Sequence, residues 1–406
     1  MALRFLGASL PLVLQAASGT QLRTDDASRT EFEASEEFWE QKAFEEFRSD
    51  WQRRHTSPWK PMEQGAANGR NLCMDGKQVP DFYVLGVQKC ATSSIAMDLM
   101  DAGMQNVHGD LNPKEFHWFD HRNDYSLVGK KGDDENRREL LKWMPTCPTP
   151  AHTLLARLRG VATEDKRIAL ADFTPDYLRV VPMPTDLERM GTGWLDVNEE
   201  NRSMPILMRR LYGDLLAEKL KFAVMIRDPL SQMQSAWYHA ESFNFHNACR
   251  SCKAPSFEAA LSTLVDGLSE SPPRYTAWLW TVLYARQLEH WFEHFHPAQF
   301  HIIPEGEYVR GDKDRICREV SDGLDFKMNC WSGGEAASHA WSHPHPKLED
   351  DAPKPLREKF HAFMVKERER LVKLLAKAQA NGLTLAAYDG ATGSEADVLA
   401  WLQARW

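Results

Sequence analysis

The sequence predicts an α/β fold in which a mainly parallel central sheet is covered by helices on both faces. Two short apolar runs, residues 82–85 and 222–226, have the character of buried strands, and each leads through a turn into a segment with helical spacing. A third apolar run, residues 300–303, follows another helical segment. Because strands alternate with helices, the sheet is expected to be mainly parallel and the helices to pack on its two faces.

The turn after the first strand carries residues that suit an anion. Gly86 ends the strand, Lys89 follows three residues later, and Thr92 and Ser93 begin the helical segment. A strand-to-helix turn directs backbone N–H groups and the positive end of a helix at an anion. The turn is P-loop-like, but no second glycine precedes the lysine as Gly-x-x-x-x-Gly-Lys-[Ser/Thr] requires. An ordinary turn with polar capping residues is the alternative interpretation.

Chemically active residues follow other predicted strands. Arg227 comes directly after the second buried strand, and Ser235 lies on the helix after it. Residues 114–120, Lys-Glu-Phe-His-Trp-Phe-Asp, combine acid, base and aromatic groups. Lys89, Asp172 and Arg227 all lie at or just after strand ends, so we expect them to converge at the carboxyl edge of the sheet, where ligands bind in such folds.

In their order along the chain, these segments resemble the carbohydrate sulfotransferase family, of the heparan sulfate and chondroitin type found in the Golgi. Residues 87–92 match its phosphosulfate loop, and residues 114–120 match its Lys-Glu-Pro-His-Phe-Phe-Asp segment. Arg227 and Ser235 match its Arg-Asp-Pro strand end with a serine eight residues after the arginine. The resemblance implies 3′-phosphoadenosine 5′-phosphosulfate as the donor, a hydroxyl of a carbohydrate-type acceptor, and no metal.

The resemblance also implies a role for each site residue. The residues that would bind the donor are Lys89, Cys90, Ala91, Thr92, Ser93, Arg227 and Ser235. The residues that would act on the acceptor are Glu115 as general base, His117 as the alternative base, and Lys114 and Asp172 as binding residues. Lys89 would also be catalytic, because it would neutralise charge on the leaving phosphate. The aromatic neighbours of Glu115 could raise the pKa of its carboxyl by excluding water.

Two segments differ from the family pattern. Residues 172–177 carry Phe173 where the family has a lysine, and residues 339–344 carry His339 and Trp341 in place of a basic pair. Two other functions therefore stay open: a small-molecule kinase using the same turn, and a nucleotide-binding homologue without catalysis. The missing Gly-Lys-[Ser/Thr] order argues against the kinase, and the intact donor and base residues argue against the inactive homologue.

Composition and charge exclude some partners. The chain has 406 residues, of which 43% are hydrophobic and 26% charged, as in an ordinary globular protein. A net charge of −9 argues against nucleic acid as the main partner, which would need a basic surface. Glycines in residues 60–78 suggest a linker between an N-terminal helix and a domain over residues 79–380. Residues 381–406 are expected to form a C-terminal tail or helix.

The N-terminus and the cysteines suggest the secretory pathway, either the Golgi lumen or secretion. Residues 1–19 have a basic start, an apolar run and small residues at the end, as in a signal peptide; a short anchor is the alternative. Seven cysteines are compatible with an oxidising compartment. Disulfides Cys249–Cys252 and Cys317–Cys330 are both plausible, and Cys90 is the candidate free thiol.

Several histidines in the C-terminal half could suggest a metal site, but we expect them to lie on the surface, because their loops are irregular and no Cys or carboxylate spacing fits a metal signature. They are His294, His296, His301, His339, His343 and His345.

Overall fold

The computed structural model describes most of the chain from residue 71 onward. The described residues are 71–107, 115–116, 118–119, 133–147, 168–179, 181, 203–242, 254–270, 273, 276–330, 345–390 and 393–406. The predicted signal peptide and N-terminal helix lie outside these ranges, as do Cys249 and Cys252. All of the described residues fall within one compact unit.

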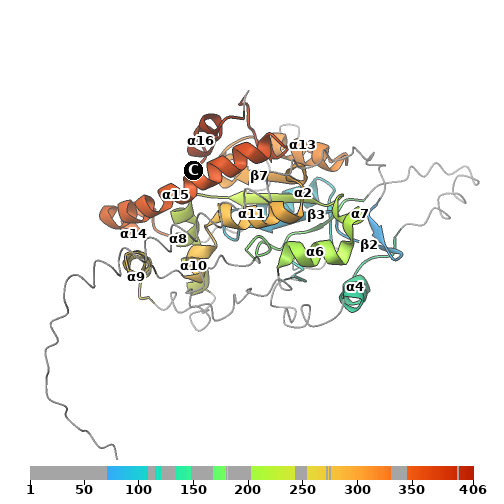
Figure 1. Ribbon diagram of the computed structural model, residues 1–406, viewed down its shortest axis with the longest axis horizontal. Coiled ribbons are helices and arrows are strands. Elements are labelled where there is room, and N and C mark those ends of the chain that lie inside the picture. Colours follow the sequence, from blue (N-terminus) through green and yellow to red (C-terminus); the bar gives the residue numbers. More distant parts are fainter. Residues whose placement is uncertain are drawn as a thin grey trace, which may run out of the picture. The chain divides into compact units, whose positions relative to one another are not determined.

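A six-stranded parallel sheet forms the centre of this unit (Figure 1). Its strands, in spatial order, are β4 (Gln105–Asn106), β5 (Leu170–Asp172), β3 (Phe82–Gly86), β6 (Lys221–Ile226), β7 (Phe300–Pro304) and β8 (Thr384–Leu385). Every pairing between them is parallel. The predicted fold class and the three predicted strands are therefore confirmed.

Helices cover both faces of the sheet. On one face, α6 (Met204–Tyr212) and α11 (Tyr284–His294) lie side by side, and α15 (Lys354–Gln379) packs along α11 (Figure 1). On the other face, α2 (Thr92–Asp101) packs with α12 (Glu305–Arg310) and α13 (Lys313–Leu324). Buried Asp98 of α2 joins these helices, because its carboxylate accepts hydrogen bonds from Tyr308 and from Lys313, the latter at 3.0 Å.

Shorter elements complete the described part of the chain. They are β1 (Cys73–Met74), β2 (Lys77–Gln78), α4 (Asp133–Lys142), α7 (Asp214–Ala217), α8 (Pro229–Ser242), α9 (Phe257–Leu268), α10 (Ala277–Trp280), the 3₁₀ turn η6 (Pro297–Gln299), α14 (Leu348–Asp351) and α16 (Glu395–Gln403). No helix among the described residues combines the length and the apolar character needed to cross a bilayer.

Aromatic side chains fill the core between the sheet and α11. The ring of Phe222 contacts the rings of Trp291, Phe295 and Phe300, with centroids 5.4, 4.8 and 4.7 Å apart. Such pairs add about 0.5–1.5 kcal/mol each beyond the area that they bury. This packing fixes α11 against β6, the strand that Arg227 follows.

The charged helix α15 is less exposed than its composition suggests. Arg286 and Glu289 of α11 pair with Glu367 and Arg370 of α15, at 2.7 and 2.5 Å. The side chains of all four residues are less than one-fifth exposed. The side of α15 that faces α11 is therefore a largely buried ion-pair layer, although the helix is rich in charged residues.

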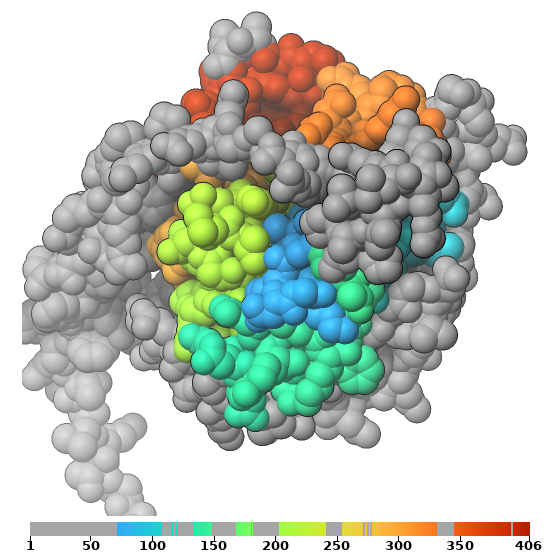
Figure 2. All heavy atoms as spheres, turned by 90° about the vertical axis from the view of Figure 1, so that its right-hand side faces the viewer, coloured from blue at the N-terminus to red at the C-terminus, as the bar shows by residue number. Residues whose placement is uncertain are grey.

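Within the described ranges, two disulfides link segments of the fold. Cys317–Cys330 forms, as the sequence suggested, and Cys73–Cys147 ties the β1–β2 hairpin to the segment after α4. Figure 2 shows this hairpin, in blue, against the green segment of residues 133–147. Cys90 is free and buried, as predicted. Two disulfides are typical of a protein from an oxidising compartment.

The two disulfides should differ in their contribution to stability. They close loops of different length, since the cysteines are 74 and 13 residues apart. Loop-closure entropy then predicts losses of about 4.5 kcal/mol for the Cys73→Ser/Cys147→Ser variant and about 3 kcal/mol for the Cys317→Ser/Cys330→Ser variant. Urea unfolding of both variants beside the wild type measures this. Equal stability of the wild type and the Cys73→Ser/Cys147→Ser variant would contradict a stabilising Cys73–Cys147 disulfide.

Candidate active site

The winding of the sheet reverses at β3. From β3 the chain runs to the edge strand β4, returns to β5 beside β3, and then continues on the other side through β6, β7 and β8. Ligands in open parallel sheets bind where the direction of winding reverses, beyond the carboxyl ends of the strands. Lys89 follows β3, Asp172 ends β5 and Arg227 follows β6, so all three lie at the carboxyl ends of adjacent strands.

Glycine is required at the end of β3. Gly86 has φ of +137°, a conformation that side chains disfavour, and a Cβ there would collide with the carbonyl of Pro175. The backbone of Leu178 donates to the carbonyl of Leu85 at 2.7 Å, which holds the loop after β5 against this strand end. The turn after Gly86 is therefore placed directly beside the Asp172 segment.

Residues 87–91 form the turn between β3 and α2. Lys89 and Ala91 have φ of 68° and 60°, and such left-handed residues bend the backbone into anion-binding concavities. Helix α2 begins at Thr92, and its N-cap residue Ala91 supplies no side-chain cap. The first turn of a helix has N–H groups without helical acceptors, so Thr92 and Ser93 present donors together with the positive end of the helix dipole.

Two cations meet at this turn. The guanidinium of Arg227 donates to the carbonyl of Lys89 at 3.3 Å. Burial and then the nearby charge of Arg227 lower the pKa of the Lys89 ammonium. The carboxylate of Glu305 lies 4.0 Å from Arg227. Because the two positive charges oppose each other, an anion bound between them would be stabilised by both.

Neighbouring side chains that the sequence analysis missed hold Arg227 and the turn in place. The hydroxyl of Tyr284, at the start of α11, donates to the carbonyl of Arg227 at 3.0 Å. The amide of Gln232, on α8, donates to the carbonyl of Gln88 at 2.9 Å. Asp228 caps α8 by accepting from both the backbone and the hydroxyl of Ser231 at 2.8 Å. These contacts fix the two turns relative to each other.

Three of the predicted donor-binding residues are buried: Cys90, Thr92 and Ser235. Ser235 lies in the second turn of α8 and is 7% exposed, so its contact with a phosphate stays a prediction. Cys90 is fully buried, and burial raises the pKa of its thiol. A buried neutral thiol does not contact an anion directly, so Cys90 can contribute to binding through its backbone only.

Asp172 is the centre of a buried hydrogen-bond network. One oxygen accepts from the hydroxyl and the backbone of Thr174 at 2.7 and 3.1 Å and from the backbone of Phe116 at 3.5 Å. The other oxygen accepts from the hydroxyl of Tyr177 at 2.9 Å. That hydroxyl also accepts from the backbone of Trp118 at 2.9 Å. The Asp172 carboxylate is fully buried and holds the 115–119 segment; its predicted contact with an acceptor stays a prediction.

Glu115 is carried to the carboxyl edge of the sheet by this network. It is partly exposed, whereas Phe116 and Phe119 beside it are buried. Phe116 stacks on Trp118, with ring centroids 5.8 Å apart. The other predicted acceptor residues, Lys114 and His117, lie outside the described residues.

Comparisons with known proteins find similarity among solved structures. The sequence matches no protein-family model and no curated protein. Among solved structures, the chain is similar to a sulfotransferase from Alicyclobacillus acidocaldarius, with 18% identity and a TM-score of 0.39. The match covers 73% of this chain and 95% of that one. The function proposed below therefore depends on the residues of the site.

The Asp172 network should make stability depend on pH. Burial raises the pKa of Asp172 from its ordinary 3.8 to about 6, and its hydrogen bonds offset part of that rise. Between these two values the folded protein keeps a proton that the unfolded chain has lost. The resulting stabilisation is therefore complete at low pH and is lost as the pH rises through about 6.

We expect this dependence to vanish in the Asp172→Asn variant. As the pH falls from 7.5 to 4.5, the wild type should gain about 2 kcal/mol of unfolding free energy relative to that variant. Urea unfolding at both pH values measures the gain. Asp75→Asn, at an exposed position, is the control and should follow the wild type. If the difference in unfolding free energy between the wild type and Asp172→Asn is the same at both pH values, the pKa of the Asp172 carboxyl is not raised.

Proposed function

We propose that this chain is a sulfotransferase that moves a sulfuryl group from 3′-phosphoadenosine 5′-phosphosulfate to a hydroxyl, or an amine, of a carbohydrate-type acceptor. The observation that carries the proposal is the meeting of Lys89 and Arg227 at the uncapped N-terminus of α2. This arrangement suits a ligand with several negative charges, and the donor carries a phosphosulfate and a separate 3′-phosphate.

The proposed reaction requires the protein mainly to position the donor and the acceptor and to neutralise the charge on the departing phosphate. The acceptor oxygen forms a bond to sulfur while the bond from sulfur to the 5′-phosphate oxygen breaks, and the acceptor proton passes to a base. Lys89 and the N–H groups of the turn would neutralise the charge that develops on the departing phosphate. Arg227, held by Tyr284, would bind the 3′-phosphate, with Ser235 as its partner.

Glu115 is the proposed base, with His117 as the alternative. Glu115 is partly exposed, and the backbone next to it donates to the Asp172 carboxylate at Phe116 and to the Tyr177 hydroxyl at Trp118. This support holds the base in a fixed position before the acceptor binds. Much of the rate advantage of general-base catalysis comes from such positioning.

The acceptor side differs from that of the resembling family. Phe173, in place of the family's lysine, is fully buried and contributes to the core. No cation from this position reaches the acceptor, and the net charge of −9 disfavours a highly sulfated polymer. We therefore favour an acceptor with little negative charge, modified in the Golgi lumen or another compartment of the secretory pathway.

Nucleotide binding separates this proposal from a kinase. ADP lacks a 3′-phosphate, whereas adenosine 3′,5′-bisphosphate carries one and should occupy the Arg227 site. We expect the bisphosphate to raise the melting temperature, and at 100 times its dissociation constant to add about 2.7 kcal/mol of stability. ADP at the same concentration should add much less. Equal stabilisation by the two nucleotides, measured by thermal unfolding, would favour the kinase.

The role of Arg227 can be tested with a matched variant. Arg227→Ala should reduce the preference for the bisphosphate by about 1.5–3 kcal/mol, the usual value of a hydrogen bond to a charged group. Arg318→Ala removes a guanidinium that is 56% exposed on α13 and should leave the preference unchanged. Calorimetric titration of both variants measures the difference, and an unchanged preference in Arg227→Ala would exclude the proposed 3′-phosphate contact.

The role of Glu115 is tested by turnover. Glu115→Gln keeps the size of the side chain but cannot accept the acceptor proton, so turnover should fall by about 10²–10⁴-fold. Binding of adenosine 3′,5′-bisphosphate should change little. Glu218→Gln, at an exposed position after α7, is the control. Near-normal transfer of labelled sulfate by Glu115→Gln would move the role to His117.

A further inference from the structure

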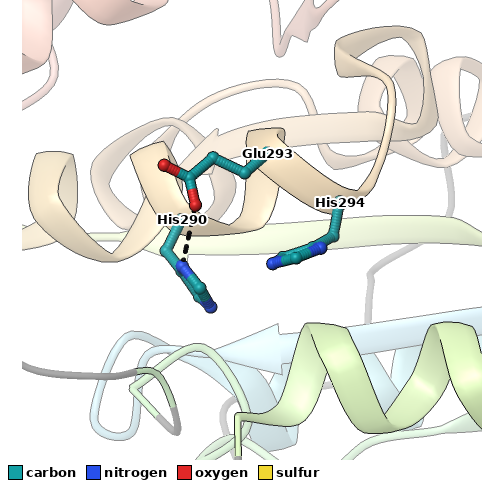
Figure 3. Close-up of side chains that lie close together, drawn as sticks. All are labelled: His290, Glu293 and His294. Carbon is teal, nitrogen blue, oxygen red and sulfur yellow. Dashed lines mark hydrogen bonds and ion pairs between the residues drawn. The ribbon is translucent and has the colours of Figure 1, made fainter. Parts of the chain in front are cut away.

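We propose that His290, Glu293 and His294, in the last turn of α11, form a binding site for a divalent transition-metal ion, with zinc as the expected occupant. One ligand atom from each of these residues lies within 4.8 Å of the other two. It is the one such group among the described residues. Figure 3 shows both imidazole rings projecting from the same side of α11, with the Glu293 carboxylate beside the His290 ring.

The spacing of the three residues favours a shared ion. Residues four apart on a helix lie on one face, so His290 and His294 can approach the same point. The ring centroids of these two histidines are 4.9 Å apart, and Oε2 of Glu293 lies 3.1 Å from Nδ1 of His290. Ligand atoms around tetrahedral zinc are about 3.3 Å apart, so the His290–Glu293 pair already has this spacing, and the His294 nitrogen, within 4.8 Å of both, would have to move closer.

Ser203 forms a hydrogen bond of the kind that metal-binding histidines make through the ring nitrogen that does not bind the metal. Its hydroxyl lies 2.7 Å from Nε2 of His290. Ser203 is the N-cap residue of α6, where a serine usually accepts from its own helix, yet its side chain makes no cap bond. A proton on Nε2 that donates to this hydroxyl leaves Nδ1 as the ligand atom. Such outer contacts orient ligating histidines and fix their tautomer.

The surrounding charges permit a cation. The cluster occupies the C-terminal end of α11, where the helix dipole favours positive charge. Arg209 donates to the carbonyl of His294 at 2.6 Å and would repel an ion. Its guanidinium is balanced by Asp214, which accepts from it at 2.8 Å. Two imidazoles and one carboxylate suit zinc and leave a fourth position for water.

The site is separate from the proposed donor site. Tyr284, which bonds to Arg227, lies at the opposite end of α11, about 15 Å away by the rise of an 11-residue helix. An ion at the C-terminal end would join α11 to the start of α6 through Ser203. We therefore assign it a structural role in holding these two helices together, independent of the sulfuryl-transfer proposal.

Metal titration of the full-length protein tests the proposal. After treatment with a chelator, the wild type should bind one Co²⁺ per chain with visible absorption bands, and Zn²⁺ should displace it. His294→Ala and Ser203→Ala should each weaken Zn²⁺ binding by about 10–100-fold. His361→Ala, at an exposed position on α15, is the control and should bind as the wild type does.

Thermal unfolding supplies the second readout. Zn²⁺ should raise the melting temperature of the wild type and of His361→Ala, but not that of His294→Ala. Circular dichroism of the metal-free variants establishes that they fold, and Ser203→Ala gives an independent comparison if a histidine variant does not. Failure of the wild type to bind Co²⁺, or equal affinity in His294→Ala and the wild type, would overturn the proposal.

Discussion

The parallel pairing of β3 with both β5 and β6 is the constraint on which the candidate site depends. Tyr83 of β3 pairs with Asp172 on one side and with Phe222 on the other, so the three strands end at the same edge. Gly86 then allows the end of β3 to pass directly against the carbonyl of Pro175. Segments from three distant parts of the sequence are brought together by this packing before any ligand binds.

The site combines two kinds of electrostatic organisation. At the turn after β3, Lys89 and Arg227 lie close together, which costs stability that an anion, if bound there, would restore. Beside it, Asp172 is buried at a further cost, but its hydrogen bonds fix the backbone around Glu115. Both features place charged groups in advance, and active sites characteristically give up some stability for such preorganisation.

The sequence was most informative where local patterns determine structure. Apolar runs followed by charged turns located the central strands, and therefore located Lys89 and Arg227 at one edge. The free thiol of Cys90 and the Cys317–Cys330 disulfide were also anticipated. These inferences need only the alternation of strands and helices and the short spacing of two cysteines.

Long-range contacts were beyond such patterns. Cys73 and Cys147 are 74 residues apart, and no spacing rule pairs them. The buried role of Asp172 depends on Tyr177 and on the backbone of a segment more than 50 residues earlier. By contrast, the proposed metal site could have been suggested by a local pattern. The run His-Trp-Phe-Glu-His at residues 290–294 places two histidines four apart with a carboxylate between them, a spacing that occurs in zinc enzymes.

The central claim is that the turns after β3 and β6 together bind the two phosphate groups of one nucleotide. A crystal structure of the protein with adenosine 3′,5′-bisphosphate tests this most directly. The account predicts the 5′-phosphate within hydrogen-bond distance of the Lys89 ammonium and the N–H groups of Thr92 and Ser93, and the 3′-phosphate against Arg227 and Ser235. A nucleotide bound elsewhere, or one whose 3′-phosphate does not contact Arg227, would contradict it.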